Sequence, residues 1–338
     1  MAPTPLAQPS SAARPAGDSP DLSASPTSAT SPDTDSPGTD SPETPFAGAA
    51  VLDDPVAAAR PIDPAALNLA ARSVADLIQS AGLTAPEDFC LAGRGDDAVV
   101  TCGAGDLGSS RIIALVGDSR AGQWLPALDA LGRRHRWRVR TYLKRDCAFT
   151  APPVMAEGQP YLECQDWGEH VLARLTGTER PTVVMTTSGV QTAYGPNGAP
   201  PQATLVEGYA AYWRRLAGVG VLPVILADTP RPSPEQITTC LRAHPDTYLT
   251  ECARAFAVGP GSIPLRQASR GVTQARWIDL GMRICPDLMC WPVIGDTLVY
   301  RDGDYLSTAY AASLAPALWR LFVRVAPATI PVPGMTTP

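Results

Sequence analysis

Histidine is scarce in this sequence, and its cysteines lack the spacing of a metal site. Three histidines occur among 338 residues, and no two of the eight cysteines stand in a C-x2-C pair. Structural zinc sites take cysteine and histidine ligands at short, regular spacings of that kind. We therefore expect no metal site in this protein.

Long apolar runs are also missing. No stretch approaches the roughly 20 uninterrupted apolar residues that a membrane-spanning helix needs. The first 20 residues contain no basic segment followed by an apolar one, so no signal peptide is readable. The sequence therefore predicts neither a membrane span nor a visible export signal.

A surplus of basic charge is missing as well. The net charge of −6 lies entirely in residues 1–60, since residues 61–338 hold 25 acidic and 25 basic side chains. Proteins that bind nucleic acids present a basic surface to the phosphates. We therefore expect no nucleic-acid partner.

Residues 1–60 have a composition of their own. Ser, Thr and Pro fill 26 of these 60 positions, and Asp-Ser-Pro occurs three times. Such a segment buries too little apolar surface to offset the entropy that is lost on ordering. We predict a disordered acidic linker over residues 1–60, one domain over residues 61–330 and a flexible tail over residues 331–338.

The rest of the sequence alternates between short apolar runs and helical patterns. Five runs predict β-strands: Ile112–Val116, Trp137–Leu143, Thr182–Thr187, Leu222–Ala227 and Trp277–Leu280. Five stretches have helical spacing: Pro64–Ala81, Trp124–Leu131, Asp166–Leu175, Val206–Ala217 and Ser307–Val325. This alternation is typical of a doubly wound, mostly parallel α/β sheet with helices on both faces. Ligands of such sheets bind outside the carboxyl ends of the strands.

The cysteines fall in near-neighbour pairs along the chain. These are Cys90 and Cys102, Cys147 and Cys164, Cys240 and Cys252, and Cys285 and Cys290. Each pair flanks a stretch without helix or strand periodicity, where a disulfide would staple a loop. The sequence alone leaves about a hundred connectivities open. We expect structural disulfides, with buried thiols as the alternative.

The even number of cysteines also bears on location. Disulfides persist in oxidising compartments. We therefore expect an extracytoplasmic protein, at the cell surface or tethered to a membrane, whose export signal or anchor lies upstream of Met1 or on a neighbouring gene product. The alternative is a reduced cytosolic protein with buried thiols.

The strongest local motif, Gly117-Asp118-Ser119, follows the apolar run Ile112–Val116. Gly117 permits a sharp turn, and Ser119 then lies at the N-terminus of the next predicted helix. Backbone N–H groups and the helix dipole favour a developing oxyanion there, which makes Ser119 a candidate nucleophile. The plainer alternative is that Ser119 only caps its helix.

A second motif precedes the last predicted helix. The segment Val299–Ser307 contains Asp302 and, three residues later, Tyr305. This segment matches the pattern Asp-x-x-His except at its final position.

Together, the two motifs resemble the SGNH hydrolase superfamily. The match is closest to the SGNH domains attached to membrane acyltransferases of the acyltransferase 3 type, which O-acylate cell-surface glycans. Further motifs of that subgroup occur in the same order: Gln123-Trp124-Leu125-Pro126, Lys144-x-x-Cys147, Cys164-x-x-Trp167, Asp228-Thr229-Pro230 and Cys285…Cys290. The resemblance spans about residues 85–325, and it implies an SGNH- or flavodoxin-like three-layer sandwich.

The resemblance implies roles for three residues. Ser119 would be the nucleophile that forms an acyl-enzyme, and Asp302 would orient the general base. The family has a histidine as that base where this sequence has Tyr305. A phenol with an ordinary pKa of about 10 takes up a serine proton poorly at neutral pH. A slow or inactive enzyme is therefore expected.

The family's oxyanion hole is also altered. Its Gly-x-Asn-Asp block is absent after the predicted strand Thr182–Thr187, where Ser188 and Gly189 follow. The oxyanion candidates are therefore Ser119, Ser188 and Gly189. Losing one donor of an oxyanion hole typically costs about a hundredfold or more in rate.

The three histidines do not occupy the position of the expected base. His135 lies between a predicted helix and a strand, and His170 lies within a helix. His244 stands in a loop near the strand ends, which makes it the one alternative base for Ser119. Asp228, at the end of a predicted strand, either faces the same edge of the sheet or caps the following turn.

Two functions therefore stay open. The first is O-acyl transfer, most simply acetyl transfer, to a cell-surface polysaccharide, or ester hydrolysis on it, through Ser119. The second is a degenerate SGNH domain that binds a glycan or a partner protein without catalysis. The resemblance implies a glycan acceptor and a membrane acyltransferase that supplies the acyl group. It implies no metal and no soluble cofactor.

Overall fold

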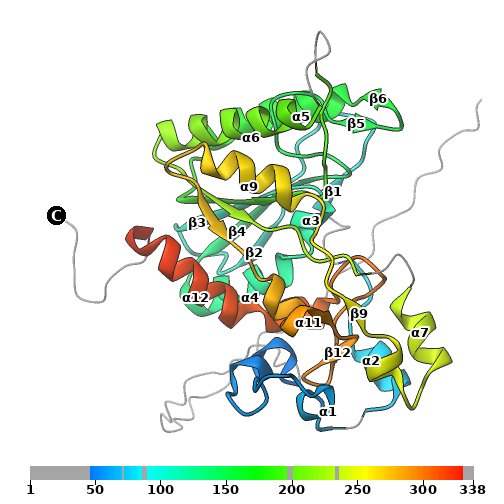
Figure 1. The fold of residues 1–338 in the computed structure, drawn as a ribbon. Helices are drawn as coiled ribbons and strands as arrows, with labels where there is room; N and C mark the ends of the chain where they lie inside the picture. The colour runs from blue at the N-terminus through cyan, green and yellow to red at the C-terminus, as the bar shows by residue number, and fades with distance from the viewer. Residues whose placement is uncertain (1–45, 71, 86–89, 196–200, 233–235, 330–338) are drawn as a thin grey trace, which may run out of the picture. The chain divides into compact units, whose positions relative to one another are not determined.

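The computed structural model describes residues 46–70, 72–85, 90–195, 201–232 and 236–329 (Figure 1). The predicted tail over residues 331–338 and the first 45 residues of the predicted linker lie outside these ranges. Within them, no helix combines the length and the hydropathy that crossing a bilayer requires.

A seven-stranded sheet forms the centre of the domain. Its strands are β1 (Leu91–Ala92), β2 (Gly103–Gly105), β3 (Ile112–Gly117), β4 (Arg138–Lys144), β7 (Val183–Thr187), β8 (Leu222–Leu226) and β10 (Arg276–Ile278). Their order is β1-β4-β3-β7-β8-β10, and β2 pairs with β4. All pairs are parallel except the antiparallel pair β2–β4. The predicted, mostly parallel α/β sheet is therefore confirmed.

Helices cover both faces of this sheet (Figure 1). On one face lie α4 (Leu125–His135), α11 (Thr308–Ser313) and α12 (Ala315–Val325); on the other lie α5 (Leu162–Thr176), α6 (Pro201–Gly218) and α9 (Ser262–Arg270). The central strand β3 is apolar throughout because both its faces are buried. Its Ile113 and Leu115 belong to one core, whereas Ala114 and Val116 belong to the other. The three-layer arrangement follows from this alternation.

Two predicted helices are each divided in the structure. The stretch Pro64–Ala81 forms α1 (Pro64–Leu67) and α2 (Val74–Ser80), because the Asn68 side chain donates hydrogen bonds to the Pro64 and Val293 carbonyls and ends the first helix. The C-terminal stretch divides between α11 and α12 at Leu314, just before a proline that cannot donate to the preceding turn. Ser307 caps α11 as expected, since its hydroxyl accepts the Tyr310 N–H at 3.1 Å.

Part of the segment that composition groups with the linker packs on the domain. A short 3-10 helix spans Gly48–Asp53, and its Ala49 and Leu52 are buried in the core. The Ala49 N–H donates to the Ser313 hydroxyl of α11 at 2.8 Å. Residues 48–53 therefore belong to the domain, because their apolar side chains find a place in its core although the flanking sequence is rich in Ser, Thr and Pro.

Short elements and disulfides complete the carboxyl-edge loops. The short elements are β5 (Met155–Ala156), β6 (Gln159–Pro160), α7 (Ile237–Ala243), α8 (Tyr248–Glu251), β9 (Arg254–Ala255), α10 (Gly281–Ile284), β11 (Met289–Cys290), β12 (Val293–Ile294) and β13 (Thr297–Leu298). Four disulfides join Cys90 to Cys102, Cys147 to Cys164, Cys240 to Cys252, and Cys285 to Cys290. The disulfide-stapled loops expected from the sequence are therefore present, in near-neighbour pairs.

Candidate active site

Ser119 lies where the central strand turns into the short helix α3 (Ser119–Gly122). Gly117 ends β3 with φ of +146°, and a Cβ at this position would stand 2.5 Å from the Thr187 carbonyl oxygen of β7. Only glycine therefore allows this turn and this approach of the two strands. Asp118 caps α3, and its carboxylate accepts the Arg120 N–H at 2.8 Å. This geometry brings Ser119 to the carboxyl edge of the sheet.

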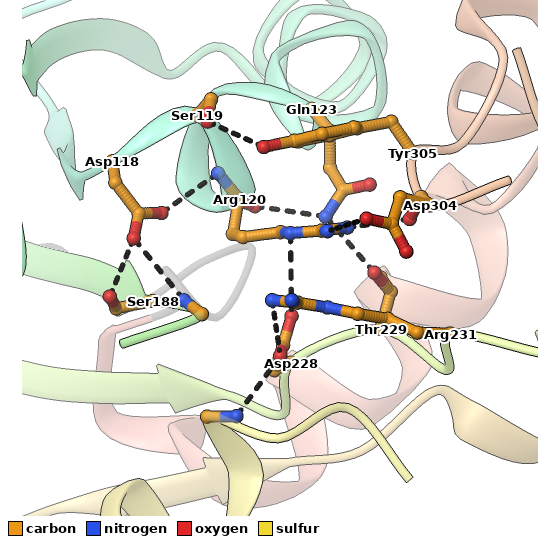
Figure 2. Close-up of polar contacts among 12 residues, drawn as sticks. Asp118, Ser119, Arg120, Gln123, Ser188, Asp228, Thr229, Arg231, Asp304 and Tyr305 are labelled. Carbon is orange, nitrogen blue, oxygen red and sulfur yellow. Dashed lines mark hydrogen bonds and ion pairs between the residues drawn. The ribbon is translucent and has the colours of Figure 1, made fainter. Parts of the chain in front are cut away.

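The Tyr305 phenol contacts the Ser119 hydroxyl. The two oxygens are 2.8 Å apart, although the residues are separated by 186 positions in the sequence (Figure 2). Tyr305 stands in a tight loop that is closed by the Arg301 N–H, which donates to the Tyr305 carbonyl at 2.9 Å. The structure thus brings the two sequence motifs together, with Tyr305 at the nucleophile candidate.

Burial governs the acidity of this phenol. Tyr305 is half-buried, and desolvation raises its pKa above the ordinary value, more than the nearby Arg120 lowers it. The phenol therefore keeps its proton at neutral pH, which makes it a poor acceptor for the proton of Ser119.

Asp302 shapes the loop that carries Tyr305. One of its carboxylate oxygens accepts the backbone N–H groups of Asp304 and Tyr305, each at 2.6 Å. The other oxygen lies 3.8 Å from the Arg301 Nε. These contacts fix the loop backbone, and the role of Asp302 in orienting a base stays a prediction.

Asp118 is a buried carboxylate that engages two of the oxyanion candidates. Its Oδ2 accepts the Ser188 hydroxyl at 2.6 Å and the Gly189 N–H at 3.2 Å (Figure 2). Burial raises the pKa of Asp118 to about 6 despite these hydrogen bonds. In this conformation the Ser188 and Gly189 donors serve Asp118, so their action on an oxyanion would require that they exchange partners.

Arg120 lies buried beneath Tyr305. The Arg120 guanidinium carbon is 3.9 Å from the centre of the Tyr305 ring, and its Nη1 donates to the Asp304 carbonyl at 2.5 Å. Its Nε lies 4.0 Å from the Asp228 carboxylate. Figure 2 shows the Tyr305 ring on one side of the Arg120 guanidinium and Asp228 on the other.

Asp228 belongs to the site and does not merely cap a turn. Its Oδ2 accepts the Arg231 Nη2 and the Gly261 N–H, each at 3.1 Å, and burial raises the pKa of this carboxyl. Gln123 links the same region to the Tyr305 loop, because its amide donates to the Thr229 hydroxyl at 3.2 Å and accepts the Leu306 N–H at 3.1 Å.

Sequence reasoning missed the parts played by Arg120, Arg231 and Asp304. Arg120 directly follows Ser119 in the sequence, and Arg231 follows the Asp228-Thr229-Pro230 motif, so position alone marked both as neighbours of the site. No spacing rule reveals that Arg120 meets a loop 184 positions away. That contact follows from the folding of the sheet.

A polar cleft of about 460 Å³ opens over Ser119 and Tyr305. Residues 190–192 line one part of it, and residues 155–157 of the β5–β6 hairpin line another. Arg94 pairs with the carboxylates of Asp146 and Glu157, which also line the cleft. The mixed charges and the exposed polar groups suit a hydroxyl-rich ligand.

The described residues that line this cleft include no histidine. His135 stacks on Trp319 with ring centres 3.7 Å apart, and the His170 Nδ1 lies 3.2 Å from the Asp97 carboxylate. His244 is exposed at the end of α7. In the part of the chain that the structure describes, no group of three or more His, Cys, Asp or Glu side chains is arranged to hold a metal ion.

Comparison with known proteins gives one family match. Residues 85–320 match the family model described as the SGNH domain fused to AT3 domains. The curated proteins contain no match to this sequence.

Comparison with solved structures gives two weak similarities. One is the periplasmic domain of the lipopolysaccharide acetyltransferase of Salmonella ser. Paratyphi A, with 10% identity over 64% of this chain and 85% of that chain, and a TM-score of 0.48. The other is an active-site mutant of a family two carbohydrate esterase from Clostridium thermocellum, with 10% identity over 64% of each chain and a TM-score of 0.38.

Proposed function

Because the chain belongs to the family of SGNH domains fused to AT3 domains, we propose that it transfers an acyl group to a cell-surface polysaccharide, or removes one by hydrolysis, through an acyl-enzyme on Ser119. Acetyl is the simplest acyl group for this role. The observation that supports the proposal is the position of the Ser119 hydroxyl. It stands at the start of a helix, at the carboxyl edge of a parallel sheet, in a polar cleft.

The proposed reaction has two steps. In the first, the Ser119 oxygen attacks the ester carbonyl carbon, the bond to the alcohol breaks, and the alcohol leaves with the serine proton. In the second, a glycan hydroxyl or water takes the acyl group, and its proton returns to the serine oxygen. Each step needs a group that accepts a proton at neutral pH.

Tyr305 makes proton removal slow in the native protein. Its phenol holds its proton, so it shares a hydrogen bond with the Ser119 hydroxyl and is a poor acceptor of the serine proton. A serine site that lacks its base retains roughly 10³–10⁴-fold catalysis over water from binding and oxyanion stabilisation. We therefore propose a low native rate.

A second candidate function is a binding module for a glycan or a partner protein. The observation that favours it is the 2.8 Å contact between the Tyr305 phenol and the Ser119 hydroxyl. The phenol stands at the position where the family has a catalytic imidazole. The two hydroxyls and the polar lining of the cleft offer hydrogen-bond partners to a sugar.

The proposal extends to partners, location and domain organisation. A membrane acyltransferase would supply the acyl group, as the fusion to AT3 domains suggests, and a cell-surface glycan would accept it. Four disulfides support an extracytoplasmic location, since such bonds persist in oxidising compartments. The Ser- and Pro-rich residues 1–45 would then act as a linker or stalk.

Hydrolysis of a chromogenic acetate tests the proposal. We compare the native protein with Tyr305→His, with Tyr305→Phe as a ring-preserving control, and with Tyr305→His/Ser119→Ala. The proposal predicts that only Tyr305→His gains activity, by about tenfold or more, and that the gain vanishes with Ser119. A fast native protein would overturn the proposed effect of Tyr305, and a gain that persists without Ser119 would overturn Ser119 as the nucleophile. A folded but silent Tyr305→His favours the binding module.

A further inference from the structure

Arg120 is a charged side chain in an unusual place. Its side chain is only 4% exposed, directly after the candidate nucleophile. A buried guanidinium is tolerated only where other groups satisfy its charge and its donors. Its partners therefore indicate why it is there.

One side of Arg120 is anchored in the protein core. Its Nε lies 4.0 Å from the carboxylate of Asp228, whose side chain is fully buried. Asp228 is itself fixed by the Arg231 guanidinium and the Gly261 N–H. The Arg120 Cγ also packs on Gly189, where an added Cβ would stand 3.2 Å away.

On its other side, Arg120 contacts the loop of residues 302–305. Its Nη1 donates to the Asp304 carbonyl at 2.5 Å, and its Nη2 lies 3.3 Å from the Asp304 carboxylate. The Tyr305 ring lies over the same guanidinium at 3.9 Å. One planar group thus holds the backbone, a carboxylate and the aromatic ring of this loop.

We propose that Arg120 is the positioning residue that fixes the loop of residues 302–305 on Ser119, and that Arg120 and Tyr305 act as one coupled unit. The loop is also tied to the turn at Ser119 by the hydrogen bond between the Tyr305 phenol and the Ser119 hydroxyl, at 2.8 Å. Gln123 holds Leu306, one residue beyond the loop. Asp302 binds amides within the loop itself.

The coupling has a chemical consequence, which rests on the proposed function. A phenol is neutral and stacks well on a guanidinium. An imidazole that takes the proton of Ser119 becomes a cation. At this position it would face the guanidinium of Arg120 and that of Arg301, whose carbon atoms lie 3.9 Å and 4.7 Å from the centre of the Tyr305 ring. The charges of Arg231 and Asp118 also act on this position and are the same in all the variants compared below. Like charges at such a separation disfavour the protonated form. The guanidinium of Arg120 therefore lowers the pKa of a histidine placed at position 305 and makes it a weaker base.

Hydrogen exchange of the loop tests the positioning role without reference to catalysis. We compare Arg120→Gln with Arg111→Gln, because Arg111 makes a similar contact with the Trp137 ring, at 3.8 Å, and does not line the cleft. Amides of residues 301–306 should exchange about tenfold faster or more in Arg120→Gln than in the native protein. In Arg111→Gln they should exchange at the native rate. Unchanged exchange in both overturns the proposal.

A gentler variant covers the case in which Arg120→Gln fails to fold. Asp304 is 45% exposed at its side chain, so Asp304→Ala removes one end of the contact without opening the core. The exchange of the same amides should then rise by a smaller factor of about three. No rise in a folded Asp304→Ala contradicts the positioning role.

Titration of the imidazole by NMR tests the coupling. The imidazole of Tyr305→His should have a lower pKa than the imidazole of Tyr305→His/Arg120→Gln. In Tyr305→His/Arg120→Lys, which keeps the charge, the pKa of the imidazole should remain as low as in Tyr305→His. A loss of packing alone would affect both double variants alike. Equal pKa values in Tyr305→His and Tyr305→His/Arg120→Gln overturn the coupling.

Activity then separates the two proposals. Tyr305→His/Arg120→Gln should hydrolyse a chromogenic acetate about tenfold faster or more than Tyr305→His/Arg120→Lys, because both variants lose the hold of the guanidinium on the loop and only the lysine keeps the charge. If both remain silent while exchange and titration behave as expected, the proposed function fails and the inference stands. If both are active at equal rates, the coupling fails and the proposed function stands.

Discussion

At the residue scale, the site combines side chains whose charges depend on burial. Asp118 illustrates this most clearly, because it accepts three hydrogen bonds and still has a pKa raised to about 6 by its loss of water. It adjoins the candidate nucleophile Ser119 in sequence and holds the residues that follow β7, Ser188 and Gly189. A change in the protonation of Asp118 therefore alters its hydrogen bonds to Ser188 and Gly189, which lie at the cleft.

Asp118 predicts a pH dependence of stability. Its pKa in the folded protein lies above the ordinary value of 3.8, so the folded state binds the proton more tightly than the unfolded state does. The free energy of unfolding should therefore rise, through this group, as pH falls from about 6 to about 4, by at most about 3 kcal/mol. Chemical denaturation at several pH values measures it.

Asp118→Asn serves as the control for this prediction, because it removes the titration while keeping a side chain of the same size. Other carboxylates titrate in both proteins, so the quantity of interest is the difference between native and variant. That difference should change between pH 4 and pH 6. A constant difference contradicts the raised pKa.

At this scale, the sequence could reveal only those parts of the site whose residues lie close together along the chain. Gly117, Asp118 and Ser119 form one short motif, and Tyr305 follows Asp302 at a fixed spacing, so both parts could be found by eye. The stacking of Arg120 on Tyr305 could not, because it joins positions that only the fold brings together.

At the element scale, the approach of β3 to β7 builds the nucleophile turn. All five predicted strands occur. The strands β3, β7 and β8 are largely apolar runs that are buried on both faces, whereas β4 alternates half-buried arginines with buried apolar residues at its start. The edge strands β1 and β2 escaped prediction because two or three residues carry no periodic signal. The break between α1 and α2 escaped it because the contact of Asn68 with Val293 is tertiary.

Gly117→Ala should destabilise this junction. A methyl group would meet the Thr187 carbonyl at 2.5 Å, and φ of +146° is unfavourable for any other residue. We expect a loss of about 2–4 kcal/mol in the free energy of unfolding. Denaturation with urea measures it.

Gly218→Ala is the matched substitution for this test. Gly218 ends α6, and an added Cβ there meets no atom within 4 Å. It should leave stability unchanged or raise it slightly. If Gly117→Ala proves as mild as Gly218→Ala, the steric account of the turn is wrong.

At the scale of the whole molecule, the carboxyl-edge loops depend on covalent links. The four disulfides each close a short stretch of 5 to 17 residues. Near-neighbour spacing suggested these pairs, but the sequence did not exclude other connectivities. The boundary of the domain was harder to predict, because buried Ala49 and Leu52 lie within a segment of linker-like composition.

Non-reducing peptide mapping should recover these four pairs from protein produced by export. Reduction should lower the free energy of unfolding by about 2–4 kcal/mol for a typical bond, because each closure restricts the unfolded chain. Eight free thiols in exported protein would refute both the connectivity and the proposed location, whereas a different pairing would refute the connectivity alone.

The central claim is that Ser119 stands ready as a nucleophile but lacks a base, because Tyr305 occupies the place of the imidazole. The rate of Ser119 labelling by a fluorophosphonate ester, followed by mass spectrometry, tests this most directly. The serine oxygen displaces fluoride from phosphorus, and the stable adduct reports activation of Ser119 without any turnover. The account predicts slow labelling of the native protein and labelling about tenfold faster or more in Tyr305→His, confined to Ser119. Native labelling as fast as that of Tyr305→His would contradict it.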